Sequence, residues 1–342
     1  MSNDFSKKIV LLGTGGTIAG SAADADDNLG YTAAQRGVTQ LLQAVPDVAL
    51  APYTLVAEQV AQLDSKDMSF AVWRQLALRC AHWLAQDEVQ GIVITHGTDT
   101  LEETAFFLQS VLPTRLTACK PVVLTCAMRP ASARFPDGPQ NLSDALMVAG
   151  DAAAKGVLVL CAGRIHSAAQ VQKIHPYRLD AFDSGEAGPL GFVEEGRARW
   201  VNAPVPVLAS SVTAEGERPI DPPPVGALEI VEGLTQWPRV EIVMNYAGAS
   251  GFMVDAMLAH AGNELEPLRG LVVAATGNGT LHFDLEAALL RAQAAGVRVV
   301  LASRCSYGRV LPRSGAPFPD SRGLSPVKAR VALLLELAAA CV

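Results

Sequence analysis

The sequence of 342 residues lacks any long apolar run and any dense cluster of positive charge. No stretch approaches the roughly 20 apolar residues that a membrane-spanning helix needs, so no membrane association is expected. Lysine and arginine total 27 against 34 aspartate and glutamate residues, which gives a net charge of -7. The charge pattern of a nucleic-acid-binding protein is therefore missing, and a small molecule is the expected ligand.

The sequence also lacks the residue pairs that mark common metal and hydrolase sites. Its six cysteines contain no CxxC pair, and its six histidines contain no HExxH motif or other close ligand pair. A GxSxG motif, which carries the nucleophile of many serine hydrolases, does not occur. We therefore expect no metal site, reduced and mostly buried cysteines, and chemistry based on hydroxyl groups.

The amino-terminal segment has little of what an export signal needs. After Lys7 and Lys8, only residues 9–12 form an apolar run before a glycine turn. This run is too short for the apolar region of a signal peptide. The sequence therefore predicts a cytoplasmic protein.

Half of the residues are apolar, and short apolar runs recur between longer segments with helical spacing. The helical spacing is clear in residues 70–84 and 101–112. The alternation predicts an α/β fold with a mostly parallel sheet whose strands are buried on both faces. The predicted strands are residues 9–12, 91–95, 121–126, 156–161, 240–244, 271–276 and 297–302.

A change of composition at residues 207–226 divides this pattern. Serine, threonine, glutamate and proline replace the apolar residues, and three consecutive prolines stiffen the chain. This composition is typical of a connector between domains. We expect an amino-terminal domain at residues 1–206, a linker at 207–226 and a carboxyl-terminal domain at 227–342.

The first candidate site follows the strand at 9–12 and reads GTGGTIAG. Ligands of open parallel sheets bind at the carboxyl ends of the strands, where a glycine-rich turn lets the backbone approach a substrate closely. A nucleotide is not expected, because Ile18 stands where the dinucleotide fingerprint needs glycine and Ser21 where the P-loop needs lysine. A tight turn with Thr17 as a helix cap is an equally good interpretation.

The second candidate site is the stretch HGTDTLEET at residues 96–104. It places a hydroxyl beside a carboxylate at a strand end, which offers a nucleophile or proton carrier next to a group that can hold an ammonium. The spacing by itself favours a structural interpretation over this one. Asp99 with Glu102, or Thr100 with Glu103, also fits a capping box at the start of the next helix.

Two further polar residues decide nothing alone. Ser65 precedes a helical pattern, where it could cap the helix or contact a carboxylate of a ligand. Lys173 follows the strand at 156–161 and its loop, where a lone lysine is usually a solvated surface charge. Either residue indicates a functional site only if it lies close to other candidate site residues.

Together these stretches resemble the bacterial L-asparaginase and glutaminase-asparaginase family of amidohydrolases. The first signature of that family matches TGGTIAG at residues 14–20, and the second matches GIVITHGTDTLEETA at residues 91–105. The resemblance implies a larger amino-terminal domain with a mostly parallel sheet and a smaller carboxyl-terminal α/β domain. Similarity continues in order through residues 64–68, 127–130, 137–139, 245–247 and 277–279.

The resemblance also implies a reaction, which is hydrolysis of L-asparagine to L-aspartate and ammonia, with side activity on L-glutamine and without a cofactor or metal. The counterpart of Thr17 attacks the side-chain amide carbon and forms an acyl-enzyme, which water then hydrolyses. Tyr31 resembles the tyrosine that activates this threonine from a mobile loop. Residues 21–30 have the small, polar composition that suits such a lid.

A second group implied by the resemblance is Thr98, Asp99 and Lys173, joined by hydrogen bonds. A lysine can take a proton from a hydroxyl only if desolvation lowers its pKa toward the working pH. Of the two threonines, we expect Thr17 to form the covalent bond and Thr98 to orient water or assist.

The substrate-binding roles are carried over from the same resemblance. Asp99, beside Thr98, should receive the α-ammonium of the substrate, and Ser65 should hold its α-carboxylate. The backbone carbonyl of Ala127 should face the side-chain amide. Asn278 should come from a neighbouring subunit, so the resemblance implies a homo-oligomer, either a dimer or a tetramer.

Three positions depart from the family pattern. Lys66 stands where many members carry a glutamine that touches the α-ammonium, so a like charge is expected to alter affinity or side-chain orientation. Thr280 replaces an asparagine that is common after Gly-Asn-Gly. A glutamate supplied by the neighbouring subunit has no match, because no glutamate occurs between Glu286 and Glu336.

Two other functions remain open. A catalytically inactive amino-acid-binding protein on the same fold should have lost one of the paired hydroxyls of Thr17 and Thr98. A partner of a tRNA-dependent amidotransferase is disfavoured by the acidic charge and by the short segment before Ile9.

Overall fold

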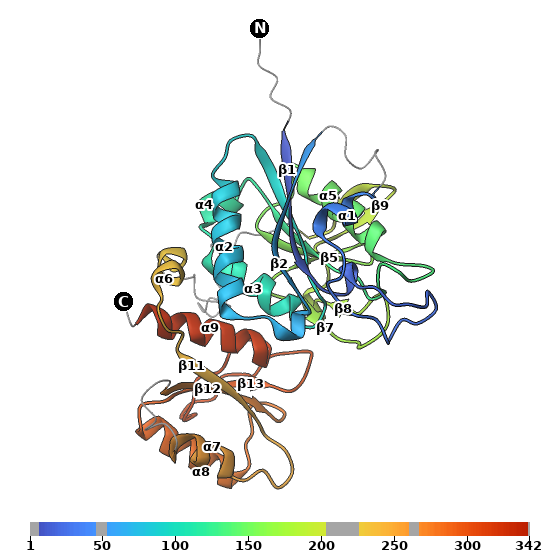
Figure 1. Cartoon of the computed structure of the whole chain (residues 1–342). Helices are drawn as coiled ribbons and strands as arrows, with labels where there is room; N and C mark the ends of the chain where they lie inside the picture. The colour runs from blue at the N-terminus through green and yellow to red at the C-terminus, as the bar shows by residue number, and fades with distance from the viewer. Residues whose placement is uncertain (1–6, 46–52, 203–225, 260–266, 341–342) are drawn as a thin grey trace. The chain divides into compact units, whose positions relative to one another are not determined.

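The computed structural model describes residues 7–45, 53–202, 226–259 and 267–340. The chain divides into two compact units, residues 1–210 and 211–342 (Figure 1). The predicted connector at 207–226 lies outside the described residues except for its last one. The domain boundaries expected from composition therefore stay a prediction.

Unit 1 is built on one eight-stranded sheet with the strand order β10-β9-β6-β5-β4-β3-β1-β2. The strands from β2 to β5 in this order pair in parallel, and β6, β9 and β10 extend the sheet by antiparallel pairing. This confirms the predicted mostly parallel sheet. The strands are β1 (Lys8–Gly15), β2 (Thr54–Leu63), β3 (Val89–Thr95), β4 (Val122–Thr125), β5 (Val157–Cys161), β6 (Arg164–Ser167), β9 (Gly191–Glu194) and β10 (Arg197–Trp200), and β7 (Gln172–Lys173) pairs with β8 (Phe182–Asp183) in a separate ribbon.

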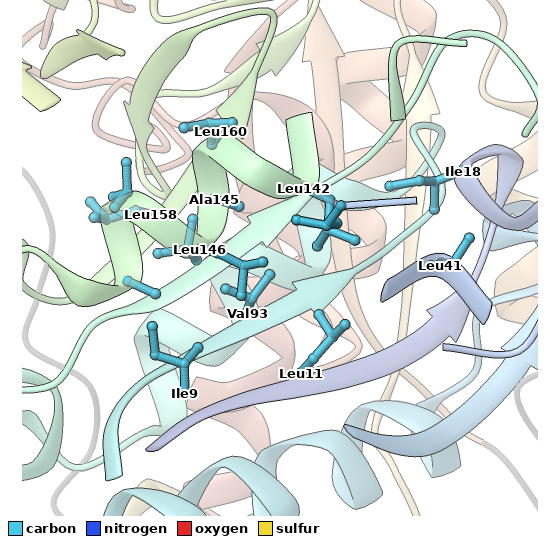
Figure 2. Close-up of a cluster of buried hydrophobic side chains, with 14 of the residues drawn as sticks. Ile9, Leu11, Ile18, Leu41, Val93, Leu142, Ala145, Leu146, Leu158 and Leu160 are labelled. Atoms are coloured by element: carbon cyan, nitrogen blue, oxygen red, sulfur yellow. The ribbon is translucent and has the colours of Figure 1, made fainter. Parts of the chain in front are cut away.

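Helices flank this sheet because its central strands are apolar on both faces. Strand β1 is buried from Ile9 onward, and β4 and β5 are buried throughout. On one face, Leu142, Ala145 and Leu146 of α5 pack with β-strand side chains such as Leu11 (Figure 2). The helices of unit 1 are α1 (Val38–Leu42), α2 (Phe70–Leu84), α3 (Leu101–Val111), α4 (Thr114–Thr117) and α5 (Gly138–Gly150), with short 3-10 turns η1 (Thr17–Ala19), η3 (Ser65–Asp67) and η4 (Gly185–Ala187).

The helix predicted at residues 70–84 is confirmed as α2, and the one predicted at 101–112 forms α3 with one residue fewer. The sequence pattern missed β2 and the antiparallel strands. Strand β2 lies at the sheet edge and is mostly half-buried or exposed, so it has no continuous apolar run. Strands β6, β9 and β10 have four residues each, which is too short for a clear period.

Unit 2 has a three-stranded parallel sheet in the order β11 (Arg239–Met244), β12 (Leu268–Ala275) and β13 (Arg298–Ser303). Helices α7 (Phe252–Ala259) and α8 (Phe283–Ala294) cover one face, and α9 (Pro326–Ala339) covers the other (Figure 1). Gly270 permits the close approach of α9, because a Cβ atom there would lie 2.8 Å from the side chain of Leu333. A short helix α6 (Ala227–Gly233) precedes the sheet. Unit 2 is thus the smaller α/β domain that was predicted.

The cysteines agree with the expectation of reduced thiols. All five cysteines in the described ranges are free, and Cys80, Cys126 and Cys161 are buried. Burial raises the pKa of the Cys80 thiol, so this side chain behaves as a small apolar residue. Of the helices in the part of the chain that the structure describes, none combines the length and the apolar composition that crossing a bilayer requires.

His96, directly after β3, is fully buried. Its Nδ1 atom lies 2.7 Å from the carbonyl oxygen of Gly97, so the ring donates from Nδ1 in its neutral form. Burial lowers the pKa of His96 to about 4. The side chain therefore stays neutral at ordinary pH and fixes the turn that follows the strand.

The burial of His96 predicts a loss of stability in mild acid. Between the unfolded-state pKa of about 6.5 and the folded-state pKa of about 4, the unfolded chain binds a proton that the folded chain does not. The contribution of neutral His96 to the free energy of unfolding is thus complete above the unfolded-state pKa and is lost as the pH falls toward the folded-state pKa. In urea titrations, the free energy of unfolding of the wild-type protein should fall by about 1.5 kcal/mol more than that of the His96→Asn variant between about pH 6.5 and pH 5.

The matched control is His82→Asn, because His82 lies exposed on α2. This variant should keep the acid-dependent loss of the wild type. Parallel stability curves for the wild type and His96→Asn across this pH range would contradict the assignment.

Candidate active site

The turn that follows β1 touches the turn that follows β3. These strands are neighbours and parallel, so their carboxyl ends lie side by side. Gly16 has a φ of 82°, and a Cβ atom there would lie 2.3 Å from the Cα of Gly97. Only glycine at position 16 fits both the backbone conformation and the contact.

Thr17 enters the site from this turn. It is the first residue of η1, is 8% exposed, and follows the cap position, which Gly16 occupies. The interpretation of Thr17 as a helix cap is therefore wrong, because its side chain makes no capping bond and is directed elsewhere. Its Oγ1 atom lies 2.6 Å from the Oη atom of Tyr31. Gly20 leaves room for this ring, since a Cβ atom there would lie 2.8 Å from Cδ2 of Tyr31.

A second hydroxyl is paired with an amine and a carboxylate. The Nζ atom of Lys173, on β7, donates to Oγ1 of Thr98 at 2.8 Å and to Oδ1 of Asp99 at 2.6 Å. The Lys173 side chain is 18% exposed and that of Asp99 is 53% exposed. Lys173 is thus a half-enclosed site residue and not the solvated surface charge that a lone lysine usually is.

Ser65 braces the turn that carries Thr98 and Asp99. Its Oγ atom accepts a hydrogen bond from the backbone N–H of Asp99 at 3.2 Å, and its carbonyl accepts one from Thr100 Oγ1 at 2.8 Å. Ser65 is 2% exposed and is not itself the cap of η3, a position that Asp64 holds.

The capping-box interpretation of residues 99–103 is wrong. Thr100 is the residue before α3, but its side chain makes no capping bond, because its hydroxyl binds Ser65 instead. The tertiary contact with η3 has replaced the local one.

Six of the predicted site residues line one pocket of about 200 Å³ within unit 1. These are Thr17, Tyr31, Ser65, Thr98, Asp99 and Lys173, which come from five separate stretches of the chain. Within the described ranges, no three histidine, cysteine or acidic side chains gather where they could hold a metal ion. The other lining residues are Asn28, Leu29, Asp64, Met128, Pro176 and Tyr177.

The structure does not bring the remaining two predicted residues into the pocket lining. Ala127 is buried just before the lining residue Met128. Asn278 belongs to unit 2, where its Oδ1 accepts a hydrogen bond from Leu311 N at 2.6 Å.

Sequence reasoning assigned no role to Asp137, which shapes one wall of the pocket. Its two carboxylate oxygens accept hydrogen bonds from the backbone N–H groups of Met128 and Arg129, each at 2.9 Å. Arg129 lies over the ring of Tyr177 at 4.1 Å and donates to its carbonyl at 3.0 Å. The only signal for Asp137 was its place in the Asp-Gly-Pro stretch shared with the family.

Lys66 does not line the pocket but is paired with Asp64, which does. Its Nζ atom lies 2.8 Å from Oδ2 of Asp64, and its side chain is 64% exposed. This hydrogen bond raises the pKa of Lys66. The effect of Lys66 on affinity or side-chain orientation, expected from the departure from the family pattern, stays a prediction.

Both units match models of known protein families. Residues 8–206 match the family model described as Asparaginase, N-terminal, and residues 239–340 match the Glutaminase/Asparaginase C-terminal domain. The two matches fall in unit 1 and unit 2 respectively.

Individual relatives cover nearly the whole chain. It is 36% identical over 338 residues to the glutaminase-asparaginase of Pseudomonas fluorescens biotype A, which covers 96% of this chain and 86% of that protein. It is also 36% identical over 339 residues to L-asparaginase 2 of Escherichia coli (strain K12), covering 96% and 88%.

A solved structure agrees with these sequence matches. The crystal structure of a probable cytoplasmic L-asparaginase from Campylobacter jejuni superposes with a TM-score of 0.83 at 34% identity, covering 97% of this chain and 95% of that one. The resemblance drawn from the two signatures is thus confirmed, and the chain belongs to the asparaginase family.

Proposed function

We propose that this protein hydrolyses L-asparagine to L-aspartate and ammonia, with L-glutamine as a secondary substrate. One observation carries the proposal. Two threonine hydroxyls from distant parts of the chain line the same small pocket, one paired with a tyrosine and the other with a lysine and an aspartate. The family relationship supports the same reaction, because the relatives are L-asparaginases and glutaminase-asparaginases.

Thr17 is the nucleophile in this proposal. A threonine hydroxyl attacks a carbonyl well only when a base takes its proton. The Oη atom of Tyr31 is 2.6 Å from the Thr17 oxygen, within reach for that transfer. Attack on the side-chain amide carbon forms the new C–O bond and breaks the C–N bond. The Thr17 proton passes through Tyr31 to the departing nitrogen, which leaves as ammonia, and an acyl-enzyme remains on Thr17.

Thr98 and Lys173 act in the second half of the reaction. Water must attack the acyl-enzyme to release the acid product. The contact of 2.8 Å between Lys173 Nζ and Thr98 Oγ1 supports a role in orienting that water and moving its proton. Asp99, at 2.6 Å from the same amine, holds the lysine in position.

Substrate recognition is assigned to residues around the two hydroxyls. Asp99 binds the α-ammonium through its partly exposed carboxylate, and Ser65 binds the α-carboxylate. The carbonyl of Ala127 faces the side-chain amide. Because Asp64 binds the ammonium of Lys66, that like charge is offset before the substrate α-ammonium arrives.

The pocket volume favours a free amino acid over a larger substrate. Sites for drug-sized ligands are about 300–1,000 Å³, whereas this pocket measures about 200 Å³. An amide carried on tRNA would have to enter through a larger opening. Discrimination between asparagine and glutamine is a finer matter, since one methylene group changes binding by about 1–3 kcal/mol.

A homo-oligomer, either a dimer or a tetramer, and a cytoplasmic location belong to the same proposal. Unit 2 exposes large apolar side chains at Met244, Tyr246, Phe252 and Met253, which supports association. The similarity to the probable cytoplasmic enzyme of Campylobacter jejuni supports the location. Another relative, from Haemophilus influenzae, is named a probable periplasmic L-asparaginase.

Replacing the proposed nucleophile should abolish turnover without unfolding the protein. Thr17→Ala is expected to lower kcat for ammonia release from L-asparagine by roughly three orders of magnitude or more, because no other group forms the acyl-enzyme. A coupled ammonia assay measures the loss. Thr114→Ala, on α4 and away from the pocket, is the control and should retain wild-type turnover. Near-normal turnover of Thr17→Ala would refute the assignment.

Lys173→Arg separates a proton-transfer role from a purely electrostatic one. Arginine keeps the positive charge beside Asp99 but cannot lose its proton in water. If Lys173 moves a proton, kcat should fall by about 10²–10⁴-fold while the KM for L-asparagine changes little. Lys8→Arg, in the partly buried ion pair with Glu88, is the matched control. Full activity of Lys173→Arg would leave only the charge as its contribution.

A complementation experiment tests whether Asn278 acts in the site of a neighbouring subunit. Thr17→Ala and Asn278→Ala chains are produced separately and together, and ammonia release is measured on each preparation. If Asn278 serves a partner, a hybrid dimer contains one intact site, so the mixture should recover roughly a quarter of wild-type activity. Activity no greater than the average of the separate variants, or an active monomer in sedimentation velocity, would contradict the proposal.

A further inference from the structure

The lid segment, residues 21–30, is tied to the loop that follows β4. The backbone N–H of Ala22 donates to Oγ of Ser132 at 2.7 Å. The backbone N–H of Arg134 donates to the carbonyl of Ala25 at 2.9 Å. These contacts lie more than 100 residues apart in sequence, so they form only when both loops are in place.

A two-pronged ion pair adds to these backbone contacts. Nε and Nη2 of Arg134 donate to the two carboxylate oxygens of Asp26, each at 2.7 Å. Such planar pairing fixes orientation as well as distance. The hydrogen bond from Arg134 lowers the pKa of Asp26, so the pair is fully charged at neutral pH. Both side chains are 62% exposed and neither lines the pocket.

Each end of this pair leads to the pocket. Asn28 and Leu29 of the lid segment line it, and Tyr31 follows directly. On the other side, Arg134 belongs to the same loop as the lining residue Met128. The ion pair therefore joins two walls of the pocket from outside.

Hydrogen bonds within residues 27–30 fix the shape of this part of the lid segment, so it should move together with Asp26. Oδ1 of Asp27 accepts hydrogen bonds from the backbone N–H groups of Leu29 at 2.9 Å and Gly30 at 2.7 Å. A change at Asp26, one residue earlier, is thereby transmitted to Leu29.

We propose that the Asp26–Arg134 ion pair is a clasp that holds the lid segment over the pocket, which makes Asp26 and Arg134 positioning residues for turnover. The clasp raises the fraction of molecules in which Asn28 and Leu29 line the pocket and Tyr31 lies against Thr17. The proposal of a clasp depends on the proposed function only in the experiments that measure hydrolysis. Because both partners are exposed, added salt weakens the clasp.

The test uses Asp26→Asn, Arg134→Gln, the double variant, and the charge swap Asp26→Arg with Arg134→Asp. Each single variant should raise the KM for L-asparagine about two- to fivefold at low salt, the shift that an exposed ion pair can give. The double variant should be no worse than either single one, and the swap should recover part of the loss. In hydrogen exchange of the free protein, the peptide spanning residues 20–31 should exchange faster in the single variants by a similar factor.

The matched control is Glu194→Gln with Arg199→Gln. This pair has the same two-pronged geometry, with contacts of 2.8 and 2.7 Å and similar exposure, but lies on the β9–β10 hairpin. It should leave KM and the exchange of residues 20–31 unchanged. High salt should bring the wild type toward the Asp26→Asn values.

Three results would overturn the clasp. The first is a hydrogen-exchange rate of residues 20–31 in both single variants that equals the wild-type rate. The second is a rise in KM in the double variant that equals the sum of the two single effects. The third is a charge-swap variant whose KM is higher than that of either single variant. Hydrogen exchange needs no substrate. A failure of the proposed hydrolysis would therefore appear as missing ammonia release with the exchange difference intact.

Discussion

The site depends on the contact between two glycine turns at the carboxyl ends of β1 and β3. A Cβ atom on Gly16 would lie 2.3 Å from the Cα of Gly97, so the two turns touch through backbone alone. This contact brings Thr17 from the first turn and Thr98 from the second to one pocket of about 200 Å³. Any side chain at position 16 would force the two turns apart and so increase the distance between Thr17 and Thr98.

The elements around this contact are loops held by polar bonds on a rigid sheet. Ser65 receives the backbone N–H of Asp99, and Asp137 receives two backbone N–H groups of the next loop. Each of these acceptors satisfies donors that would otherwise be left without a partner near the core. Loops positioned in this way carry chemistry while the buried strands supply the stability.

Sequence patterns predicted the parts of the fold that are buried on both faces. The apolar runs at 9–12 and 91–95 lie within β1 and β3, and helical spacing gave α2 its observed limits. The edge strand β2 has mixed polarity, and the short antiparallel strands have too few residues to show a period. The capping patterns near Thr100 misled for another reason, because a hydroxyl that fits a local cap can also reach a distant carbonyl.

The sequence by itself determined the family, the α/β class and the identity of six residues that gather in the pocket, because the long signatures and the apolar periodicity can be read from consecutive residues. Tertiary structure alone decided how those residues are used. Whether Lys173 is a surface charge or a partner of Thr98 depends on distances between segments 75 residues apart. The same holds for Lys66, which turns to Asp64. Spacing along a chain constrains near neighbours, whereas the direction of a side chain is set by whichever partner the folded backbone brings within hydrogen-bonding distance.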